Sequence, residues 1–316
     1  MASDFRLHDA SATRALLPAA ALVEAVAAAM RARRAGTLQA PPRSVLSLAG
    51  GQGSYLAMPA ADDRLAICKL LSVHPGNPAR GLPTIHGQVL VSDARTGVPQ
   101  ALLDGPTVTA RRTAAVSLIA LRRFGMPGAG RQIALIGAGS QALEHARMLA
   151  ELGWAGGLRI VARQPGSAQR LAQTLRDEGL LLECVTPATV ADALTDADAV
   201  ICLTTATAPV LPAQLPAAML VIGAGAFKPQ MAEIAPGLLA TRTIVVDDLD
   251  GARHEAGDLL QAGVDWQQVS ELADWLDLEA SGKSAAPAGV VVKTVGQAAW
   301  DLAAAHVAIG SLECRA

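Results

Sequence analysis

The sequence contains few aromatic residues, few cysteines and little charge. Phe, Trp and Tyr make up 3% of its 316 residues, charged residues make up 17%, and hydrophobic residues make up 51%. A core with this composition must be aliphatic and closely packed, with Ala, Leu and Val as its main side chains. A chain of this length is expected to fold into two domains.

Neither a disulfide framework nor a metal centre is expected. Cys68, Cys184, Cys202 and Cys314 lie far apart and form no Cys-x-x-Cys pair, and the six histidines do not cluster with acidic residues. Cysteines in apolar, strand-like segments are usually buried and inert. We therefore predict that the protein binds no metal.

Long apolar runs and basic clusters are also missing. The most apolar stretches, such as Ala197–Thr204, are far shorter than the roughly twenty residues that a membrane span needs. The N-terminus lacks the apolar core of a signal peptide, so we expect a cytoplasmic protein without a membrane partner. The net charge is -2 without any block of Lys or Arg. Nucleic acid is not an expected partner, because binding phosphates needs a basic surface, and scattered cations suit a small anionic substrate better.

Residues 1–115 have the pattern of a smaller α+β domain. A helix is predicted over Pro18–Arg34, and turn signals separate the strand-like runs Ser54–Pro59, Leu65–Ser72 and His86–Asp93, which is typical of a mostly antiparallel sheet. A helix over Thr109–Phe124 leads into a second domain at residues 116–295. A last helix within residues 296–316 is expected to return to the first domain.

The second domain alternates strands and helices. This alternation indicates a parallel sheet with helices on both faces, so the fold class is α/β with a Rossmann-type, doubly wound sheet. Helices are predicted at Gln141–Leu152 and Ser167–Asp177. The strands are predicted at Gln132–Gly137, Leu158–Ala162, Leu181–Val185, Ala199–Thr204, Met219–Gly223 and Thr243–Asp247.

A Gly-x-Gly-x-x-Ala turn follows the first of these strands and opens the next helix. Gly137 permits the tight turn, Gly139 lets the backbone approach a pyrophosphate, and Ala142 lets the helix pack closely against the strand. The helix N-terminus offers unpaired N–H groups and the positive end of its dipole to the phosphates. Thr204 and the segment Gly223–Gly225 follow later strands at the same sheet edge, where small residues would let a nicotinamide lie against backbone.

The second strand ends at Arg163, where enzymes that use NAD usually have Asp or Glu. A guanidinium at this position can bind a 2′-phosphate and stack on adenine, and Ser167 could add a hydroxyl. We therefore predict NADPH as the cofactor, with NADH possible as a second one. The alternative interpretation is that Arg163 is a solvated surface residue.

Arg43, Lys69 and Arg112 are the candidate substrate ligands in the first domain. Lys69 lies within an otherwise apolar strand, where a lysine needs a partner or a function. Arg112 lies near the start of the Thr109–Phe124 helix, where N–H groups already favour anions. Each cation also has a structural alternative, since lysines on strands commonly protect sheet edges from aggregation.

The arrangement resembles the ornithine cyclodeaminase and mu-crystallin family from about Arg43 to Ala305. The segments that carry the resemblance are Arg112–Ser117, Gly137–Ala142, Gly225–Pro229 with Glu233, and Val292–Gly296 with Asp301. The resemblance implies a homodimer whose first domain forms the interface and the substrate pocket. It also implies that Arg43, Lys69 and Arg112 hold a substrate carboxylate.

The resemblance further implies contacts with the cofactor and with the reacting end of the substrate. Lys293 and Thr294 match a segment that closes over the site, where Lys293 would contact the cofactor and Thr294 the substrate. Thr84 and Ile85 match positions near the nicotinamide, where Thr84 would contact both the cofactor and the substrate. The other positions that match cofactor contacts are Arg112, Ala138, Ser140, Gln141, Arg163, Thr204 and Ala224.

Two departures from the cyclodeaminases favour a reductase. Phe227 stands where they carry an acidic residue that handles the ornithine amine, and Arg163 stands where they carry an acid that suits NAD. The likeness is strongest to bacterial reductases of Δ1-pyrroline-2-carboxylate and Δ1-piperideine-2-carboxylate. We predict reduction of these cyclic imines to L-proline and L-pipecolate, with Lys69 and Arg112 as catalytic residues and Lys69 or a water as proton donor. The alternatives are an ornithine cyclodeaminase, an alanine dehydrogenase and a non-enzymatic NADPH-dependent ligand-binding protein like mu-crystallin.

Overall fold

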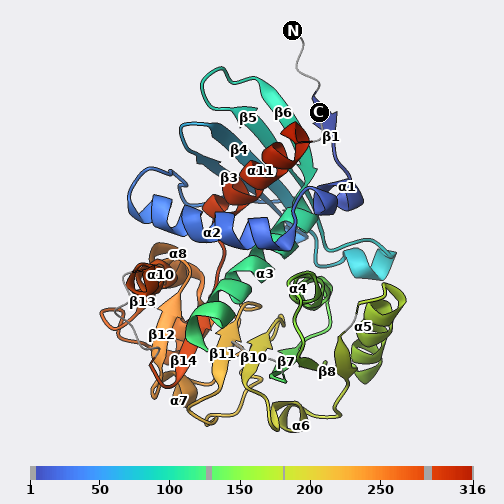
Figure 1. The fold of residues 1–316 in the computed structure, drawn as a ribbon, viewed down its shortest axis with the longest axis vertical. Coiled ribbons are helices and arrows are strands. Elements are labelled where there is room, and N and C mark those ends of the chain that lie inside the picture. Colours follow the sequence, from blue (N-terminus) through green and yellow to red (C-terminus); the bar gives the residue numbers. More distant parts are fainter. Residues whose placement is uncertain (1–4, 126–129, 181, 281–286, 315–316) are drawn as a thin grey trace. The chain divides into compact units, whose positions relative to one another are not determined.

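The structure is a computed structural model that describes residues 5–125, 130–180, 182–280 and 287–314. The chain divides into two compact units, and Figure 1 traces its path through both. The first unit combines residues 1–112 with residues 297–316, and the second contains residues 113–296. Each unit has a sheet of its own, and the two sheets differ in the direction of their strands.

The first unit is built on a six-stranded sheet with the order β1-β6-β5-β4-β3-β2. Strands β2 to β6 pair antiparallel with their neighbours, and β1 pairs parallel with β6. The strands are β1 (Arg6–Leu7), β2 (Ser44–Ser47), β3 (Ser54–Ala61), β4 (Leu65–Val73), β5 (Ile85–Asp93) and β6 (Pro99–Asp104). The predicted antiparallel sheet is therefore present, with β1, β2 and β6 in addition to the expected strands.

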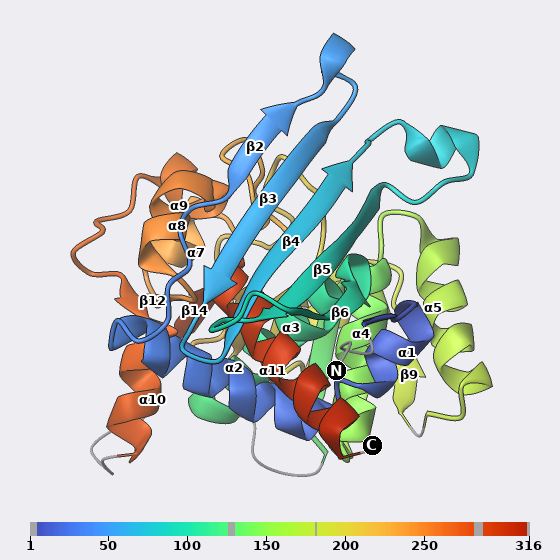
Figure 2. The ribbon, with the colours of Figure 1, turned by 90° about the horizontal axis from the view of Figure 1, so that it is seen from above.

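A long helix packs against β3 and β4 of this sheet, and a second long helix packs against the first (Figure 2). The first of these is α11 (Ala298–Glu313), and the second is α2 (Ala19–Arg34). The short helix α1 (Ala10–Ala15) precedes them. In β4, Leu65, Ile67, Lys69 and Leu71 alternate with less buried residues, because successive side chains of a strand point to opposite faces. Lys69 therefore points to the same face as the apolar residues that form the core.

Helix α3 (Gly105–Phe124) begins in the first unit and continues into the second. It starts earlier than Thr109, where the sequence pattern placed its beginning. The reason is a cap: the Asp104 carboxylate accepts a hydrogen bond of 2.8 Å from the Thr107 N–H. Such a bond satisfies a backbone donor that the first turn of a helix leaves unpaired.

The second unit is built on an eight-stranded sheet in which all pairs of neighbouring strands are parallel. The strand order is β13-β12-β14-β11-β10-β7-β8-β9. The strands are β7 (Gln132–Ile136), β8 (Gly157–Val161), β9 (Glu183–Val185), β10 (Ala199–Cys202), β11 (Leu220–Gly223), β12 (Thr243–Val246), β13 (Ser270–Glu271) and β14 (Val290–Lys293).

The chain reverses its direction across this sheet between β7 and β10. From β7 it moves outward to β8 and β9, and it then returns to the other side of β7 with β10. Because parallel crossovers are right-handed, this reversal places the later helices on the opposite face of the sheet. Ligands of open α/β sheets bind at the strand ends beside such a reversal.

Seven helices connect the strands of the second unit within the described residues. They are α4 (Ser140–Glu151), α5 (Pro165–Asp177), α6 (Val190–Leu194), α7 (Pro236–Leu239), α8 (Leu249–Glu255), α9 (Gly257–Ala262) and α10 (Leu272–Ala280). The predicted fold class, a Rossmann-type parallel sheet together with a smaller α+β unit, is confirmed. The predicted strand start at Leu181 lies outside the described residues. None of the described helices is long and apolar enough to span a membrane.

Candidate functional site

The turn between β7 and α4 has the geometry that a dinucleotide site requires. Gly137 adopts a φ of +119°, and a Cβ atom there would lie 2.6 Å from the Leu203 carbonyl oxygen on the neighbouring strand connection. A residue with a side chain rarely adopts this φ and would also collide with backbone. Gly137 is thus the one residue type that lets β7 turn into α4 beside β10.

The first turn of α4 is open to a ligand. Gly139 is the N-cap of α4, and no side chain caps this end of the helix. A Cβ atom added at Gly139 would meet nothing within 4 Å, so no protein atom crowds the turn at this position. Ala142 is fully buried against the sheet, whereas Ser140 is exposed and Ala138 and Gln141 are partly exposed. This arrangement fits a pyrophosphate bound to the helix N-terminus.

Arg163 follows β8 and precedes α5. Its side chain is exposed, and Ser167 in the first turn of α5 is partly buried. The Arg170 guanidinium donates a hydrogen bond of 2.8 Å to the Ser167 hydroxyl. Two arginines and a hydroxyl therefore belong to one short region at the end of the second strand.

A buried carboxylate organises the loops after β10 and β11. Glu233 accepts hydrogen bonds from the N–H groups of Thr204 at 2.6 Å, Gly225 at 2.8 Å and Ala226 at 2.9 Å. A Cβ atom on Gly225 would lie 2.2 Å from the Thr204 carbonyl oxygen, so only glycine allows the two loops to approach so closely. Burial raises the pKa of Glu233, which the nearby Lys293 partly offsets.

Lys293 belongs to the same buried network. Its ammonium donates hydrogen bonds of 3.0 Å to the carbonyl oxygens of Gly223 and Thr294 and lies 3.5 Å from the Asp258 carboxylate. The other oxygen of Asp258 accepts hydrogen bonds from the N–H groups of Glu233 and Ile234, at 2.5 Å and 2.8 Å. Lys293 is fully buried and Thr294 is 3% exposed.

A second cluster of buried charges lies in the first unit. The Lys69 ammonium is 2.6 Å from one carboxylate oxygen of Asp301 on α11 and 3.3 Å from the Thr109 hydroxyl on α3. Arg112 Nε lies 3.4 Å from the other oxygen of Asp301. Lys69 and Asp301 are 1% and 0% exposed. The structure thus brings together Lys69 and Arg112, two residues that the sequence patterns place far apart.

The surroundings of Lys69 change its acidity. Burial lowers the pKa of Lys69 from 10.5 to about 8, and the positive charges of Arg112 and Arg43 contribute to the decrease. The Asp301 carboxylate counteracts it by stabilising the protonated ammonium. Arg43 is therefore close enough for its charge to lower the pKa of Lys69. Thr84 lies just before β5, where its carbonyl oxygen accepts a hydrogen bond of 2.8 Å from the His74 N–H.

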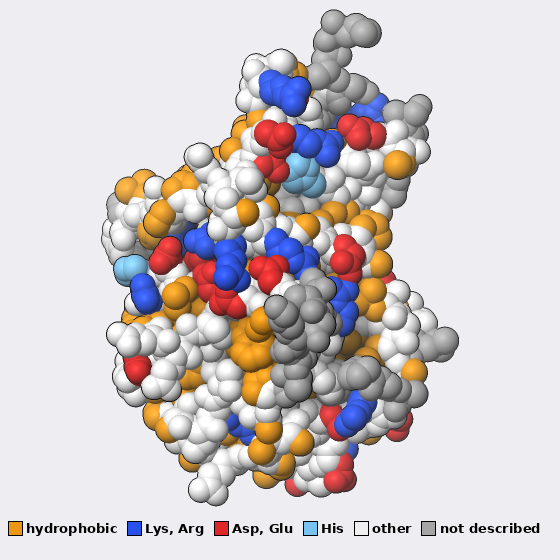
Figure 3. Space-filling model, turned by 60° about the vertical axis from the view of Figure 1, so that its left-hand side comes forward, with side chains coloured by type: hydrophobic (Ala, Val, Ile, Leu, Met, Phe, Trp, Pro, Cys, Tyr) orange, Lys and Arg blue, Asp and Glu red, His pale blue; other side chains and the backbone are white. Residues whose placement is uncertain are grey.

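The described residues contain no group of three or more His, Cys, Asp or Glu side chains that could hold a metal ion. On the face shown in Figure 3, Lys and Arg side chains are interspersed with Asp and Glu side chains instead of forming a separate basic patch.

Comparison with known proteins identifies the family. The family model of the ornithine cyclodeaminase/mu-crystallin family matches residues 6–313. This chain belongs to that family. The resemblance predicted from the sequence motifs is therefore confirmed.

Members of the ornithine cyclodeaminase/mu-crystallin family with reductase names are similar over nearly the whole chain. Delta(1)-pyrroline-2-carboxylate reductase 1 of Burkholderia multivorans is 43% identical over 98% of this chain and 96% of its own length. Delta(1)-pyrroline-2-carboxylate/Delta(1)-piperideine-2-carboxylate reductase of Azospirillum brasilense is 41% identical over 99% of this chain and 98% of its own length. Among solved structures, Delta(1)-pyrroline-2-carboxylate reductase of Thermococcus litoralis, in complex with NADH and L-proline, has a TM-score of 0.87 at 25% identity and covers 98% of both chains.

The role of two acidic residues in this family member could not be inferred from the motifs alone. Glu233 and Asp301 occur in the family-like segments, but the local sequence does not show what either carboxylate touches. The buried lysines were the available signal, because a buried ammonium requires a nearby carboxylate or carbonyl. The sequence therefore indicates that each buried lysine has a partner, but it does not show which residue that partner is.

Proposed function

We propose that this protein reduces carboxylated cyclic imines with a nicotinamide cofactor. The substrates are Δ1-pyrroline-2-carboxylate and Δ1-piperideine-2-carboxylate, and the products are L-proline and L-pipecolate. The observation that carries the proposal is the buried Lys69–Arg112 cluster, in a chain 43% identical to a protein named as a reductase of the first substrate. The reductase prediction from the sequence agrees with the names of these relatives.

The turn from Gly137 to Ala142 would hold the cofactor pyrophosphate, with Ala138, Ser140 and Gln141 as further contacts. Its open first turn and its uncapped helix end fit an anion. Arg163 would bind a 2′-phosphate, which favours NADPH over NADH. Thr204 and Ala224 would border the nicotinamide from the loops that Glu233 holds together. A reduced nicotinamide bound there supplies the hydride for the C=N bond.

Lys293 and Thr84 remain predicted cofactor contacts, together with Arg112. The bonds from Lys293 to the carbonyl oxygens of Gly223 and Thr294 support an indirect contribution, in which Lys293 shapes the backbone beside the cofactor. Thr294 would contribute to the substrate site from the same segment.

The cations of the first unit would bind and orient the substrate. Arg43, Lys69 and Arg112 would hold its carboxylate, which fixes the ring in one orientation. The imine carbon accepts a hydride when the nitrogen carries a proton, so reduction consumes one hydride and one proton per C=N bond. Lys69 is the candidate proton donor, because a pKa of about 8 leaves its ammonium protonated at neutral pH yet more acidic than an ordinary lysine.

A spectrophotometric screen tests this function. The purified protein is mixed with NADPH or NADH and with each cyclic imine, and cofactor oxidation is followed by absorbance. We expect rapid oxidation with both imines, faster with NADPH, and formation of L-proline or L-pipecolate by chiral chromatography. Absence of turnover with every imine, in protein that still binds NADPH, would show that the protein is a ligand-binding member of the family instead.

Two other enzymatic activities are separated by the same screen. Oxidation of the cofactor with pyruvate and ammonia would indicate an alanine dehydrogenase. Release of ammonia from ornithine without added reductant would indicate a cyclodeaminase. Phe227 argues against the cyclodeaminase activity, because this position has an aromatic ring in place of a carboxylate. The Lys228 ammonium lies over this ring, 5.7 Å from its centroid.

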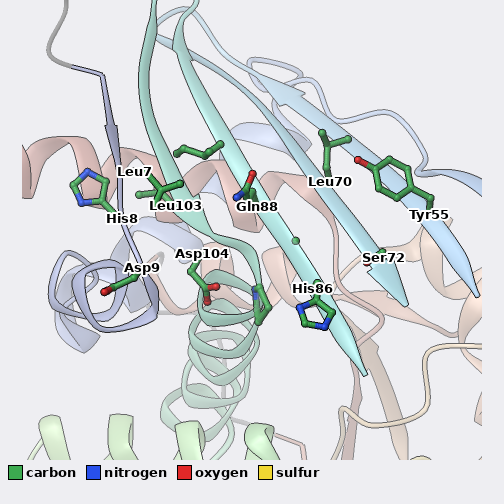
Figure 4. A pocket seen from close by; sticks show the side chains of 13 residues that line it. Leu7, His8, Asp9, Tyr55, Leu70, Ser72, His86, Gln88, Leu103 and Asp104 are labelled. Carbon is green, nitrogen blue, oxygen red and sulfur yellow. The ribbon is translucent and has the colours of Figure 1, made fainter. Parts of the chain in front are cut away.

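We also propose that the protein is a homodimer that uses the open face of the first unit's sheet. Figure 4 shows Tyr55, Leu70 and Gln88 on neighbouring strands around a cavity of about 450 Å³ on the sheet of the first unit. Large apolar side chains such as Leu7 and Tyr55 are 65% and 40% exposed, which is typical of surfaces that a second chain covers. Sedimentation velocity tests the oligomeric state. A single species with the mass of a monomer would contradict the proposed dimer.

A further inference from the structure

Asp301 occupies the first turn of α11 but does not serve that helix. The cap of α11 is Gln297, whose side-chain oxygen accepts a hydrogen bond of 2.6 Å from the Ala299 N–H. Asp301 is fully buried, and within the described residues neither of its oxygens has a hydrogen-bond partner apart from the close cations. A buried carboxylate costs free energy unless nearby groups compensate its charge. The role of Asp301 must therefore be sought in the residues that its carboxylate faces.

Those residues are the cations of the predicted substrate site. Lys69 approaches one oxygen of Asp301 to 2.6 Å, and Arg112 Nε lies 3.4 Å from the other. The neighbours of Lys69 across the sheet are apolar, namely Met58 on β3 and Val89 on β5. From α3 it meets the Thr109 hydroxyl and the Arg112 charge.

The electrostatic balance around Lys69 depends on this one carboxylate. Arg112 and Arg43 both act to remove the proton from Lys69, as does burial, and Asp301 is the group that acts to retain it. An opposite charge within a few ångströms shifts a pKa by about one to three units. Without Asp301, the ammonium would lose its proton well below the pH at which it does so now.

We propose that Asp301 is a positioning residue that acts through Lys69: its carboxylate holds the ammonium beside Arg112 and keeps it charged. In this arrangement Lys69 can bind the substrate carboxylate and supply a proton to the imine nitrogen, while the negative charge of Asp301 makes the accumulation of three cations tolerable. The inference rests on the proposed function, since it assigns the task that Lys69 performs there.

The test is the pH dependence of kcat/KM for Δ1-pyrroline-2-carboxylate in the Asp301→Asn variant. Because Lys69 is active as the protonated form, kcat/KM of the wild type should be level below pH 8 and fall above it. In Asp301→Asn this fall should begin about one to three pH units lower, so that the loss at pH 8 is at least about fivefold and shrinks as the pH is lowered. A loss of equal size at every pH would show a merely structural role and overturn the proposal.

A matched control separates this effect from a general loosening of α11. His306 on the same helix pairs with Asp62 at 2.6 Å, and His306→Gln removes that pair without touching Lys69. We expect its kcat/KM profile to keep the wild-type shape and position. A shift equal to that of Asp301→Asn would mean that any weakened contact of α11 suffices, which would also overturn the proposal.

A double variant covers the case in which Asp301→Asn does not fold. Removing both members of a buried ion pair is tolerated better than removing one, so Lys69→Met/Asp301→Asn is compared with Lys69→Met alone. If Asp301 acts through Lys69, the two variants should have the same kcat/KM within about twofold. A further loss in the double variant of more than about tenfold would contradict the proposal.

The two proposals can fail separately. If the wild type reduces none of the imines, the proposed function fails, and the role of Asp301 is then read from binding of pyrrole-2-carboxylate, a stable planar analogue, by calorimetry. We expect its affinity to fall above pH 8 in the wild type and at lower pH in Asp301→Asn. Identical pH profiles for the two proteins would overturn the inference about Asp301 whatever the reaction is.

Discussion

Each unit of this protein buries a lysine beside an aspartate, and the two lysines have different surroundings. Lys293 donates hydrogen bonds to two backbone carbonyl oxygens. The nearby carboxylates of Glu233 and Asp258 accept hydrogen bonds from backbone N–H groups. Lys69 instead faces side chains, those of Asp301 and Thr109. One network is tied to the backbone of the sheet, and the other is formed by groups that project from three separate elements.

This difference is what we expect between a structural network, around Lys293, and the proposed substrate site, around Lys69. Backbone groups cannot leave their positions without breaking the sheet, so the Lys293 network fixes the loops after β10 and β11. In the Lys69 cluster, Arg112 Nε has no hydrogen-bond partner within the described residues, and the Asp301 carboxylate is met only by the cations Lys69 and Arg112. Polar atoms that are buried without a partner are rare in proteins and often mark sites that a ligand completes.

The largest effect is expected when Lys69 is replaced. In Lys69→Ala the substrate loses a carboxylate ligand and its candidate proton donor, so kcat/KM for the cyclic imines should fall about 10³-fold. Steady-state kinetics with both imines measure this. Arg95→Ala, which removes an exposed cation from the same unit, should leave kcat/KM unchanged. A Lys69→Ala enzyme with nearly wild-type kinetics would exclude Lys69 from the site.

A smaller effect, on stability, is expected when Lys293 is replaced. Lys293→Met leaves the Asp258 carboxylate buried without its cation, which should lower the free energy of unfolding by about 3 kcal/mol. Urea denaturation followed by circular dichroism measures the change. Arg253→Met provides the control, since Arg253 is an exposed cation of the same unit and such replacements usually change stability by less than about 0.5 kcal/mol. Unchanged stability with lost activity would instead make Lys293 a direct contact of the reactants.

The smallest of these effects is expected at Arg163. A charge-assisted hydrogen bond contributes about 2 kcal/mol, so Arg163→Asp should lower the NADPH/NADH ratio of kcat/KM about 30-fold. Arg176→Asp makes the same change of charge on α5, at a position whose guanidinium bonds to Gln173 within that helix. The ratio should barely change in this control. If both variants lower the ratio equally, the preference comes from general surface charge and not from a contact of Arg163.

Much of the fold could be predicted from the sequence because its signals are local. The predicted strand at Gln132–Gly137 and the turn after it coincide with β7 and the start of α4, since apolar runs and glycines act on their immediate neighbours. Strand β14 (Val290–Lys293) was not predicted. Its three consecutive valines are a strand signal, but only the tertiary structure shows that it is a central strand between β11 and β12.

The sequence alone determined that a Gly-x-Gly-x-x-Ala turn, of the kind that binds dinucleotides, begins at Gly137 and that Lys69 lies in an apolar strand. Both follow from residue types and spacing along a few consecutive positions. Only the tertiary structure decided which carboxylate meets which lysine: Asp301 reaches Lys69 because α11 returns from the end of the chain to pack on β4. The two residues of such an ion pair come from segments far apart in the sequence, and folding of the backbone brings them into contact. A local sequence pattern therefore cannot predict the pair.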